Sequence, residues 1–151
     1  MGKMMMRKIR VALAAILLSL TASSAYADRA QWESLNAQVI QLYGHQQNAQ
    51  AEEKAKESLK VAEESFGLAS QEVAQSLNNL ALICEVQGKL AEAETHYKEA
   101  IPIMEKALGP DHPHVGTVLE NYAAILERLG KKDQAKIVRT RVRQIQKRFP
   151  K

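Results

Sequence analysis

The feature that most constrains the fold of this chain is an internal repeat with a period of 42 residues. When the sequence is shifted by 42, Ser34-Leu35-Asn36 returns as Ser76-Leu77-Asn78, and a second shift brings back Leu119 and Gly130 in place of Leu77 and Gly88. Three copies fit, over about 32–73, 74–115 and 116–149. Such a period is typical of proteins that stack short structural units, each of which packs against its neighbours.

Each copy has the pattern of two amphipathic helices. In the second copy, Leu77, Leu80, Ala81 and Cys84 recur at i, i+3, i+4 and i+7, which is one face of an α-helix. A glycine follows at position 88, and a second apolar stripe then runs over 93–108. No stretch alternates with a period of two, so strands are not expected. The sequence therefore predicts an all-α fold, an α-α superhelix of three helix pairs.

Alanines recur at positions where two helices must cross closely. Ala81 and Ala123 are one such pair, and Ala93 and Ala135 are another. The single cysteine, Cys84, lies on the same apolar stripe as Ala81. One thiol cannot form an internal disulfide, so we interpret Cys84 as a small buried hydrophobic residue.

The recurring positions resemble those of the tetratricopeptide repeat. The first copy departs from the family at Gln38 and at Gln46, where the turn glycine is missing. The 42-residue period, with Ser-Leu-Asn-Asn-Leu-Ala and Leu-Gly-Pro-Asp-His-Pro, is similar to the kinesin-light-chain type of this repeat. The family's positions fall on Leu77, Leu80, Ala81, Cys84, Gly88, Ala93, Tyr97 and Ala100 in copy two, and on Leu119, Tyr122, Ala123, Leu126, Gly130, Ala135, Arg139 and Val142 in copy three.

The resemblance implies a protein–protein interaction module whose concave groove binds an extended peptide of a partner. Asparagine suits such a groove, because its side chain both donates and accepts hydrogen bonds to a peptide backbone. For Asn79 and Asn121 the alternative is a bond between neighbouring helices. The glutamates favour a basic or neutral ligand. The implied groove residues are Asn36, Ile40, Tyr43, Asn78, Asn79, Leu82, Glu85, Glu120, Asn121, Ala124, Glu127 and Arg128.

No pattern in the sequence indicates catalysis. A Gly-flanked nucleophile, a Gly-rich phosphate loop and a His-Glu-x-x-His motif are all missing, so we predict no enzyme and no cofactor. Asp111-His112-Pro113-His114 holds plausible metal ligands, but a firm zinc site needs three or four. We interpret this segment as a helix start, with Asp111 or His112 as the cap and Pro113 in the first turn. A His-based metal-binding protein is the alternative.

Residues 1–27 have the pattern of a secretory signal peptide. Four basic residues precede the apolar run over 11–20, and Ala25-Tyr26-Ala27 places small residues at both positions that signal peptidase reads. The apolar run is shorter than the roughly 20 residues that span a bilayer, so no stable membrane anchor is expected after cleavage. We therefore predict export, to the periplasm or outside the cell, of a repeat domain over 28–151.

Charge in the predicted exported chain is unevenly placed. Residues 28–127 contain 7 Lys/Arg and 16 Asp/Glu, whereas residues 128–151 contain 10 Lys/Arg and 1 Asp/Glu. The net charges of the two parts cancel, so nucleic acid is not an expected partner. The expected partner is another protein or peptide, and the complementary charges make self-assembly the alternative. The C-terminal stripe of Ala135, Val138, Val142, Ile145 and Phe149 is narrow, which predicts a helix that caps the stack.

Overall fold

The computed structural model describes residues 25–149, so residues 1–24 of the predicted signal peptide, 1–27, lie outside the described part of the chain. The described chain consists of helices joined by short turns, and no strand occurs within 25–149, as the sequence predicted. Helix 25–44 comes first, and the others are α2 (Asn48–Phe66), α3 (Gln71–Val86), α4 (Leu90–Leu108), α5 (Pro113–Arg128) and α6 (Lys132–Arg148). None of the helices within these residues is both long and apolar enough to cross a membrane.

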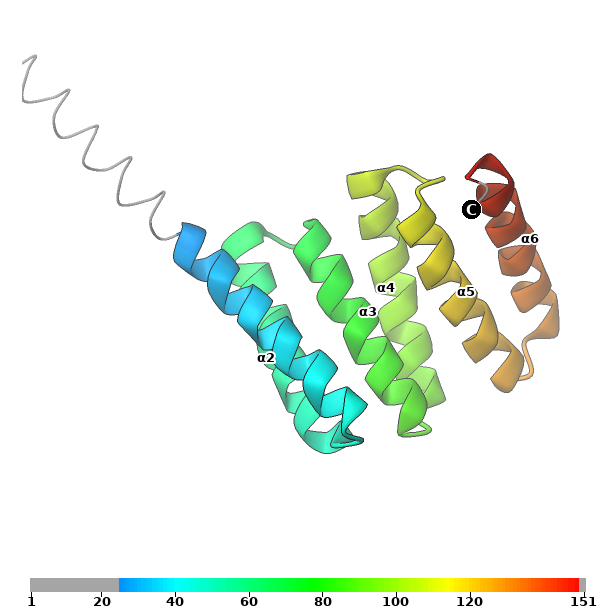
Figure 1. Cartoon of the computed structure of the whole chain (residues 1–151). Coiled ribbons are helices and arrows are strands. Elements are labelled where there is room, and N and C mark those ends of the chain that lie inside the picture. The colour runs from blue at the N-terminus through cyan, green and yellow to red at the C-terminus, as the bar shows by residue number, and fades with distance from the viewer. Residues whose placement is uncertain (1–24, 150–151) are drawn as a thin grey trace, which may run out of the picture.

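The helices form three antiparallel pairs that stack in chain order. Figure 1 shows the row running from helix 25–44 to α6, with helix 25–44, α3 and α5 side by side. Packing is closest within pairs, between α3 and α4 and between α5 and α6, and continues across the junctions from α2 to α3 and from α4 to α5. This is the α-α superhelical repeat that the sequence predicted.

Glycine ends the first helix of the second and third pairs. Gly88 has a φ of 77°, and the N–H of Lys89 reaches back to the carbonyl of Cys84 at 2.8 Å. The same turn follows α5 at Gly130. In the first pair Gln46 takes this left-handed conformation with a φ of 58°, so the turn forms without its glycine. The sequence predicted a departure from the family at Gln46. In the structure the turn keeps its shape, because Gln46 adopts a strained left-handed backbone conformation in place of the glycine.

The core is built on the small residues that recur with the repeat. Ala81, Ala93 and Ala123 are fully buried, and Ala81 and Ala93 belong to one cluster with Tyr97 and Leu126. Cys84 belongs to the same cluster, and burial raises the pKa of its thiol, as expected of an inert packing residue. The burial expected of these alanines is therefore confirmed.

The start of α5 confirms the capping interpretation of the two histidines. His112 is the N-cap, and its Nδ1 accepts a hydrogen bond from the backbone N–H of His114 at 3.2 Å. Pro113 is the first residue of the helix. The two imidazole rings meet edge to face, with their centroids 5.2 Å apart. Within the described residues, no three His, Cys, Asp or Glu side chains group closely enough to hold a metal ion.

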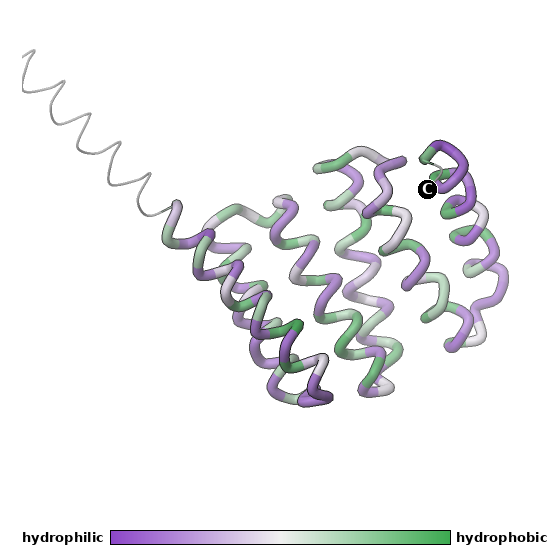
Figure 2. The backbone as a smooth tube through the Cα atoms, in the orientation of Figure 1, coloured by the Kyte–Doolittle hydropathy of each residue, from purple (hydrophilic) through white to green (hydrophobic). Residues whose placement is uncertain are grey.

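The last helix packs on α5 through a narrow apolar stripe. Ala135, Val142 and Ile145 are buried, and Gly116 of α5 leaves room for Ile145, whose Cγ2 would lie 3.3 Å from an added Cβ. Phe149, at the end of the predicted stripe, is 52% exposed because α6 has already reached its last turn. Figure 2 shows that hydrophilic residues dominate α6, with hydrophobic positions interspersed.

Candidate functional site: the face of the first helices

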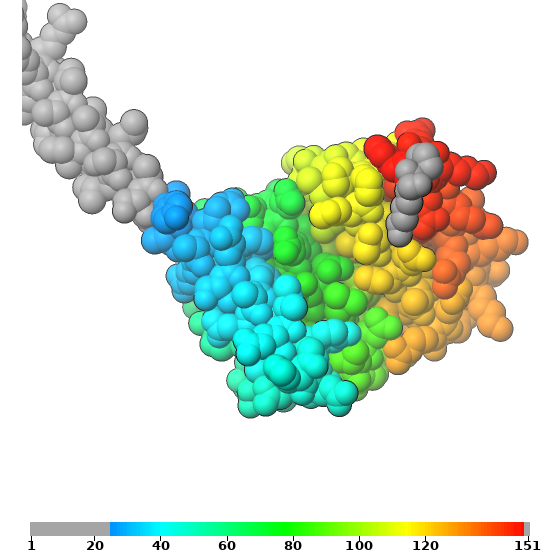
Figure 3. Space-filling model, in the orientation of Figure 1, coloured from blue at the N-terminus to red at the C-terminus, as the bar shows by residue number. Residues whose placement is uncertain are grey.

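The candidate site is the face that equivalent positions form on helix 25–44, α3 and α5. Because the period is 42, Asn36, Asn78 and Glu120 occupy equivalent positions, one on each of these helices. In the space-filling view the surface is set back over α3, between helix 25–44 and α5 (Figure 3). We call this surface the first-helix face. Its members are Asn36, Ile40, Tyr43, Asn78, Leu82, Glu85, Val86, Glu120, Ala124, Glu127 and Arg128.

Two of the predicted groove asparagines bond to each other. Asn79 donates from Nδ2 to Oδ1 of Asn36 at 2.8 Å, and Asn36 donates from Nδ2 to the carbonyl of Trp32 at 3.0 Å. Asn36 is only 5% exposed. For Asn79 the structure thus shows the alternative role, a bond between neighbouring helices. Asn36, predicted as a ligand contact, lies inside the protein, because the neighbouring helix is close enough to occupy its amide.

Asn78, one period after Asn36, is in a different situation. Its Oδ1 is buried, yet it has no hydrogen-bond partner in the described part of the chain. Asn121 stands where Asn79 stands one repeat earlier, but it does not donate a hydrogen bond to this oxygen. A buried acceptor without a donor costs about 1–3 kcal/mol. An incoming N–H group would remove that penalty.

A cleft opens beside Asn78, between the N-terminal halves of α3 and α5. Sequence reasoning missed most of its polar lining, although Gln75 and Gln71 lie one and two helical turns before Asn78 on the same side of α3. That helical spacing was the available signal. The lining residues are Gln71, Gln75, Asn78, Asn79, Met104, Leu108, His114, Thr117 and Val118.

Two glutamates of the face already have partners. Glu85 accepts from Arg128 at 3.0 Å, and Glu127 accepts two hydrogen bonds from Arg139 of α6, at 2.7 and 2.9 Å. The bonds from Arg139 also lower the pKa of Glu127. Glu120 is exposed and forms no ion pair within residues 25–149. These pairings weaken the expectation of a basic ligand, because most of the negative charge is already compensated.

The opposite end of the face is apolar. Ile40 is 65% exposed, Val86 47% and Tyr43 41%, and half-buried Leu82 lies one turn before Val86. Three of these were predicted contacts, whereas Val86 was missed, although it directly follows Glu85. Large exposed apolar side chains grouped on one surface are typical of binding sites.

Tyr97 of α4 is close to this apolar end. Its hydroxyl group is buried and has no hydrogen-bond partner among residues 25–149, and its ring packs at a centroid distance of 6.1 Å against Tyr122. Burial raises the pKa of Tyr97, and the neighbouring Glu85 and Tyr43 raise it further. The hydroxyl is therefore a neutral group that lacks a partner close to two residues of the first-helix face.

Comparison with known proteins defines the class to which this arrangement belongs. Stacked helix pairs that present a continuous face of side chains on their first helices are the architecture of an interaction module. The tetratricopeptide repeat profile matches residues 33–106 and 72–148. The chain belongs to the tetratricopeptide repeat family, whose members generally bind other proteins, and no enzyme family is indicated.

Among solved structures, the chain is similar to the crystal structure of BtubC (BKLC) from P. vanneervenii, a kinesin-light-chain-like repeat protein. The TM-score is 0.74 at 23% sequence identity, over 78% of this chain and 46% of that chain. This chain thus spans less than half of that protein, and at this identity the likeness shows the fold. None of the curated proteins matches it.

Proposed function

We propose that this protein is an exported interaction module that binds an extended peptide segment of a partner protein across the first-helix face. The observation that carries the proposal is the buried Oδ1 of Asn78 at the cleft between α3 and α5, which has no hydrogen-bond partner among the described residues. A peptide backbone presents N–H donors at regular intervals, and one of them would pair with this oxygen. Membership of the tetratricopeptide repeat family supports the proposal.

The distribution of charge and apolar surface indicates which class of peptide suits the first-helix face. The amide-lined cleft suits backbone groups, and the exposed side chains of Ile40, Tyr43 and Val86 suit one or two apolar side chains at the other end. Glu85 and Glu127 are each engaged by an arginine. A neutral peptide with an apolar anchor is therefore the expected ligand.

Selection of random peptides on the full exported chain, 28–151, provides the test. Peptides recovered in this way should bind Asn78→Ala and Tyr43→Ala at least about tenfold more weakly, because each change removes a contact that the ligand completes. Gln50→Ala, an exposed position on α2, is the matched control and should bind unchanged. Equal binding by Asn78→Ala and the parent protein would remove the basis of the proposal.

Export rests on the charged start, the apolar run over 11–20 and Ala25-Tyr26-Ala27. Cleavage after Ala27 would leave Asp28 as the N-terminal residue, most simply in a bacterial periplasm. The measurement is N-terminal sequencing of the protein recovered from the soluble extracytoplasmic fraction. Recovery there of protein that still begins at Met1 would refute cleavage.

A further inference from the structure

The last helix differs from α4 at the positions that face the following repeat. In α4 these positions are Glu94, Tyr97, Ile101 and Met104, which are at most 9% exposed. The last three belong to one cluster with Val115, Val118 and Tyr122 of α5. One period later, α6 carries Lys136, Arg139, Arg143 and Gln146, which are exposed or half-buried. We call these four residues the terminal face.

The ion pairs that join neighbouring repeats also show that α6 differs from α4. Lys89 contacts Glu52 at 2.8 Å, and Lys131 contacts Glu94 at 2.6 Å, so an identical pair joins each repeat to the next. The next equivalent of Glu52 and Glu94 is Lys136. A following repeat of the same design would place its lysine against another lysine, which is repulsive.

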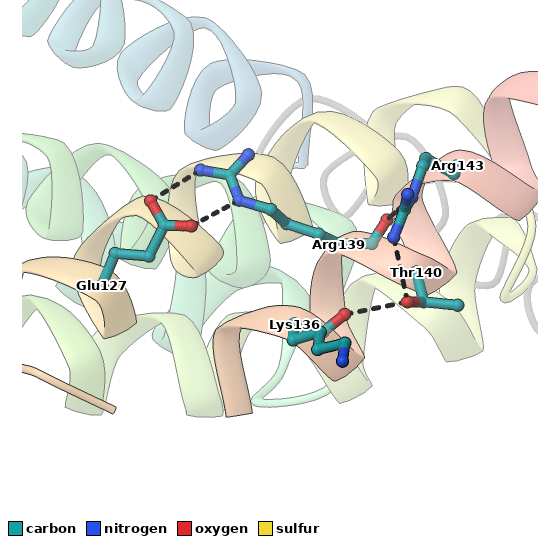
Figure 4. A network of polar contacts seen from close by, with 5 residues as sticks. All are labelled: Glu127, Lys136, Arg139, Thr140 and Arg143. Carbon is teal, nitrogen blue, oxygen red and sulfur yellow. Dashed lines mark hydrogen bonds and ion pairs between the residues drawn. The ribbon is translucent and has the colours of Figure 1, made fainter. Parts of the chain in front are cut away.

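The terminal face carries positive charge that its own surroundings do not neutralise. Arg139 is bound by Glu127, whereas Lys136 and Arg143 form no ion pair within 25–149. Arg143 instead bends back along α6, where it donates to the hydroxyl of Thr140 at 3.3 Å (Figure 4). Lys136, Arg139 and Arg143 line a shallow, open depression together with Lys132 and Glu127.

An apolar hollow continues the terminal face towards the C-terminal end of α6. It lies where Gly116 of α5 meets Ile145 of α6. The other lining residues are Pro113, Thr117, Glu120, Gln146 and Phe149, so the hollow is mainly but not wholly apolar. The equivalent region of the preceding repeat lies beside the N-terminal half of α5. By this equivalence, the hollow is where the N-terminal half of a following helix would lie.

A second copy of this chain does not suit the site. The positions of helix 25–44 that would face a preceding repeat are Gln31, Ser34, Gln38 and Gln41, where α3 has Val73, Ser76, Leu80 and Ile83. Stacking of copies in the register of the repeats would set neutral amides against the cations of the terminal face. Burial of Lys136 and Arg143 without carboxylates is unfavourable, so self-stacking is not the use of this face.

We propose that the terminal face docks an acidic amphipathic helix of a partner protein, in the place that the first helix of a following repeat would take. Carboxylates that are spaced one or two turns apart along the docked helix would pair with Lys136 and Arg143. An apolar side chain of the same helix would fill the hollow at Gly116 and Ile145. An acidic helix suits the surface better than an anionic membrane, because the equivalent positions of α4 pack against a helix, α5. This site adjoins the first-helix face, to which Glu120 and Glu127 belong, but the four residues of the terminal face are not members of that face.

Fluorescence anisotropy with a designed probe provides the test. The probe is a labelled helical peptide of about 18 residues with glutamates along one face and leucines in its N-terminal half, and its matched control has glutamine for each glutamate. The full exported chain should bind the first peptide, and binding should weaken when salt is raised from about 50 to about 300 mM. Lys136→Glu with Arg143→Glu should weaken it by at least about tenfold, and Phe149→Ser by a few fold.

The control protein carries Lys54→Glu and Lys60→Glu on α2, which change the net charge equally and should leave binding within about twofold. A cooperative thermal unfolding transition of each variant would establish that the variant is folded. The proposal fails if the terminal-face variant binds the peptide as well as the parent protein, or if the glutamine peptide binds equally. It also fails if the same two substitutions abolish binding to phosphatidylglycerol vesicles or self-association in sedimentation while the peptide does not bind.

Discussion

Lys131 donates two hydrogen bonds to the carboxylate of Glu94, at 2.7 and 2.6 Å, across the junction between the second and third helix pairs. Lys89 and Glu52 form the same contact at the preceding junction. Both carboxylates also accept from a lysine one turn further along their own helix, Lys98 and Lys56. Each junction of the stack is thus held by one largely buried glutamate between two lysines.

The first prediction concerns acid stability. Hydrogen bonds from Lys56 and Lys89 lower the pKa of Glu52 from 4.5 to about 2, and those from Lys131 and Lys98 lower the pKa of Glu94. A carboxyl whose pKa is lower in the folded state stabilises the protein above its unfolded pKa, and this contribution is lost as pH falls through the folded pKa. Stability should therefore decrease between about pH 4.5 and 2.

The variant Glu52→Gln isolates this contribution. Because solvent screens the exposed lysines, we expect a loss of about 1–2 kcal/mol at pH 7 and a smaller loss at pH 3. Urea denaturation at the two pH values measures both. Glu53→Gln, at the exposed neighbouring position, serves as the control and should have little effect. An equal loss from Glu52→Gln at both pH values would argue against an ion-pair origin.

The second prediction concerns the turn of the first repeat. Gln46 has a φ of 58°, in the region that glycine occupies at Gly88 and Gly130. Gln46→Gly should stabilise the protein by about 1 kcal/mol, because it relieves the strain of a side chain at positive φ. The reverse change, Gly88→Gln, should destabilise by a similar amount. The midpoints of urea denaturation measure both effects. If Gln46→Gly destabilised the protein, the greater conformational entropy of the unfolded chain would outweigh the relief of strain.

The third prediction concerns the close helix crossings. Ala81 and Ala123 are fully buried at equivalent positions. Ala81→Leu or Ala123→Leu should overpack the core and destabilise the protein by about 1–3 kcal/mol. Ala91→Leu and Ala107→Leu, at exposed positions of α4, are the matched controls. Thermal unfolding midpoints that stay unchanged in both core variants would contradict the packing described here.

The fourth prediction concerns the last helix. Val142 and Ile145 of α6 cover the apolar stripe of α5, which includes Leu119 and Leu126. Deletion of 136–151 should expose this stripe and cause aggregation, which sedimentation would detect. A less drastic variant, Val142→Asp, should lower stability while the chain keeps its length. A truncated protein that remained monomeric and equally stable would mean that α6 does not cap the stack.

Much of this protein is determined by local sequence pattern. The 42-residue period, the apolar stripes and the glycines at 88 and 130 define the helix pairs without any knowledge of contacts. The histidine cap before Pro113 and the burial of Cys84 were also predictable. These features depend on residues within a few helical turns of one another, where spacing alone decides which side chains share a face.

The roles of individual polar residues were decided by the tertiary structure. Asn36 and Asn78 occupy equivalent positions. The amide oxygen of Asn36 accepts a hydrogen bond from Asn79, whereas the buried amide oxygen of Asn78 has no donor within the structurally described chain. Glu127 likewise pairs with Arg139, which takes the place of Tyr97 in the preceding repeat. A hydrogen bond forms or fails over a few tenths of an ångström. The distance between helices at each junction is set by packing of the whole stack. It therefore cannot be deduced from the sequence of one repeat.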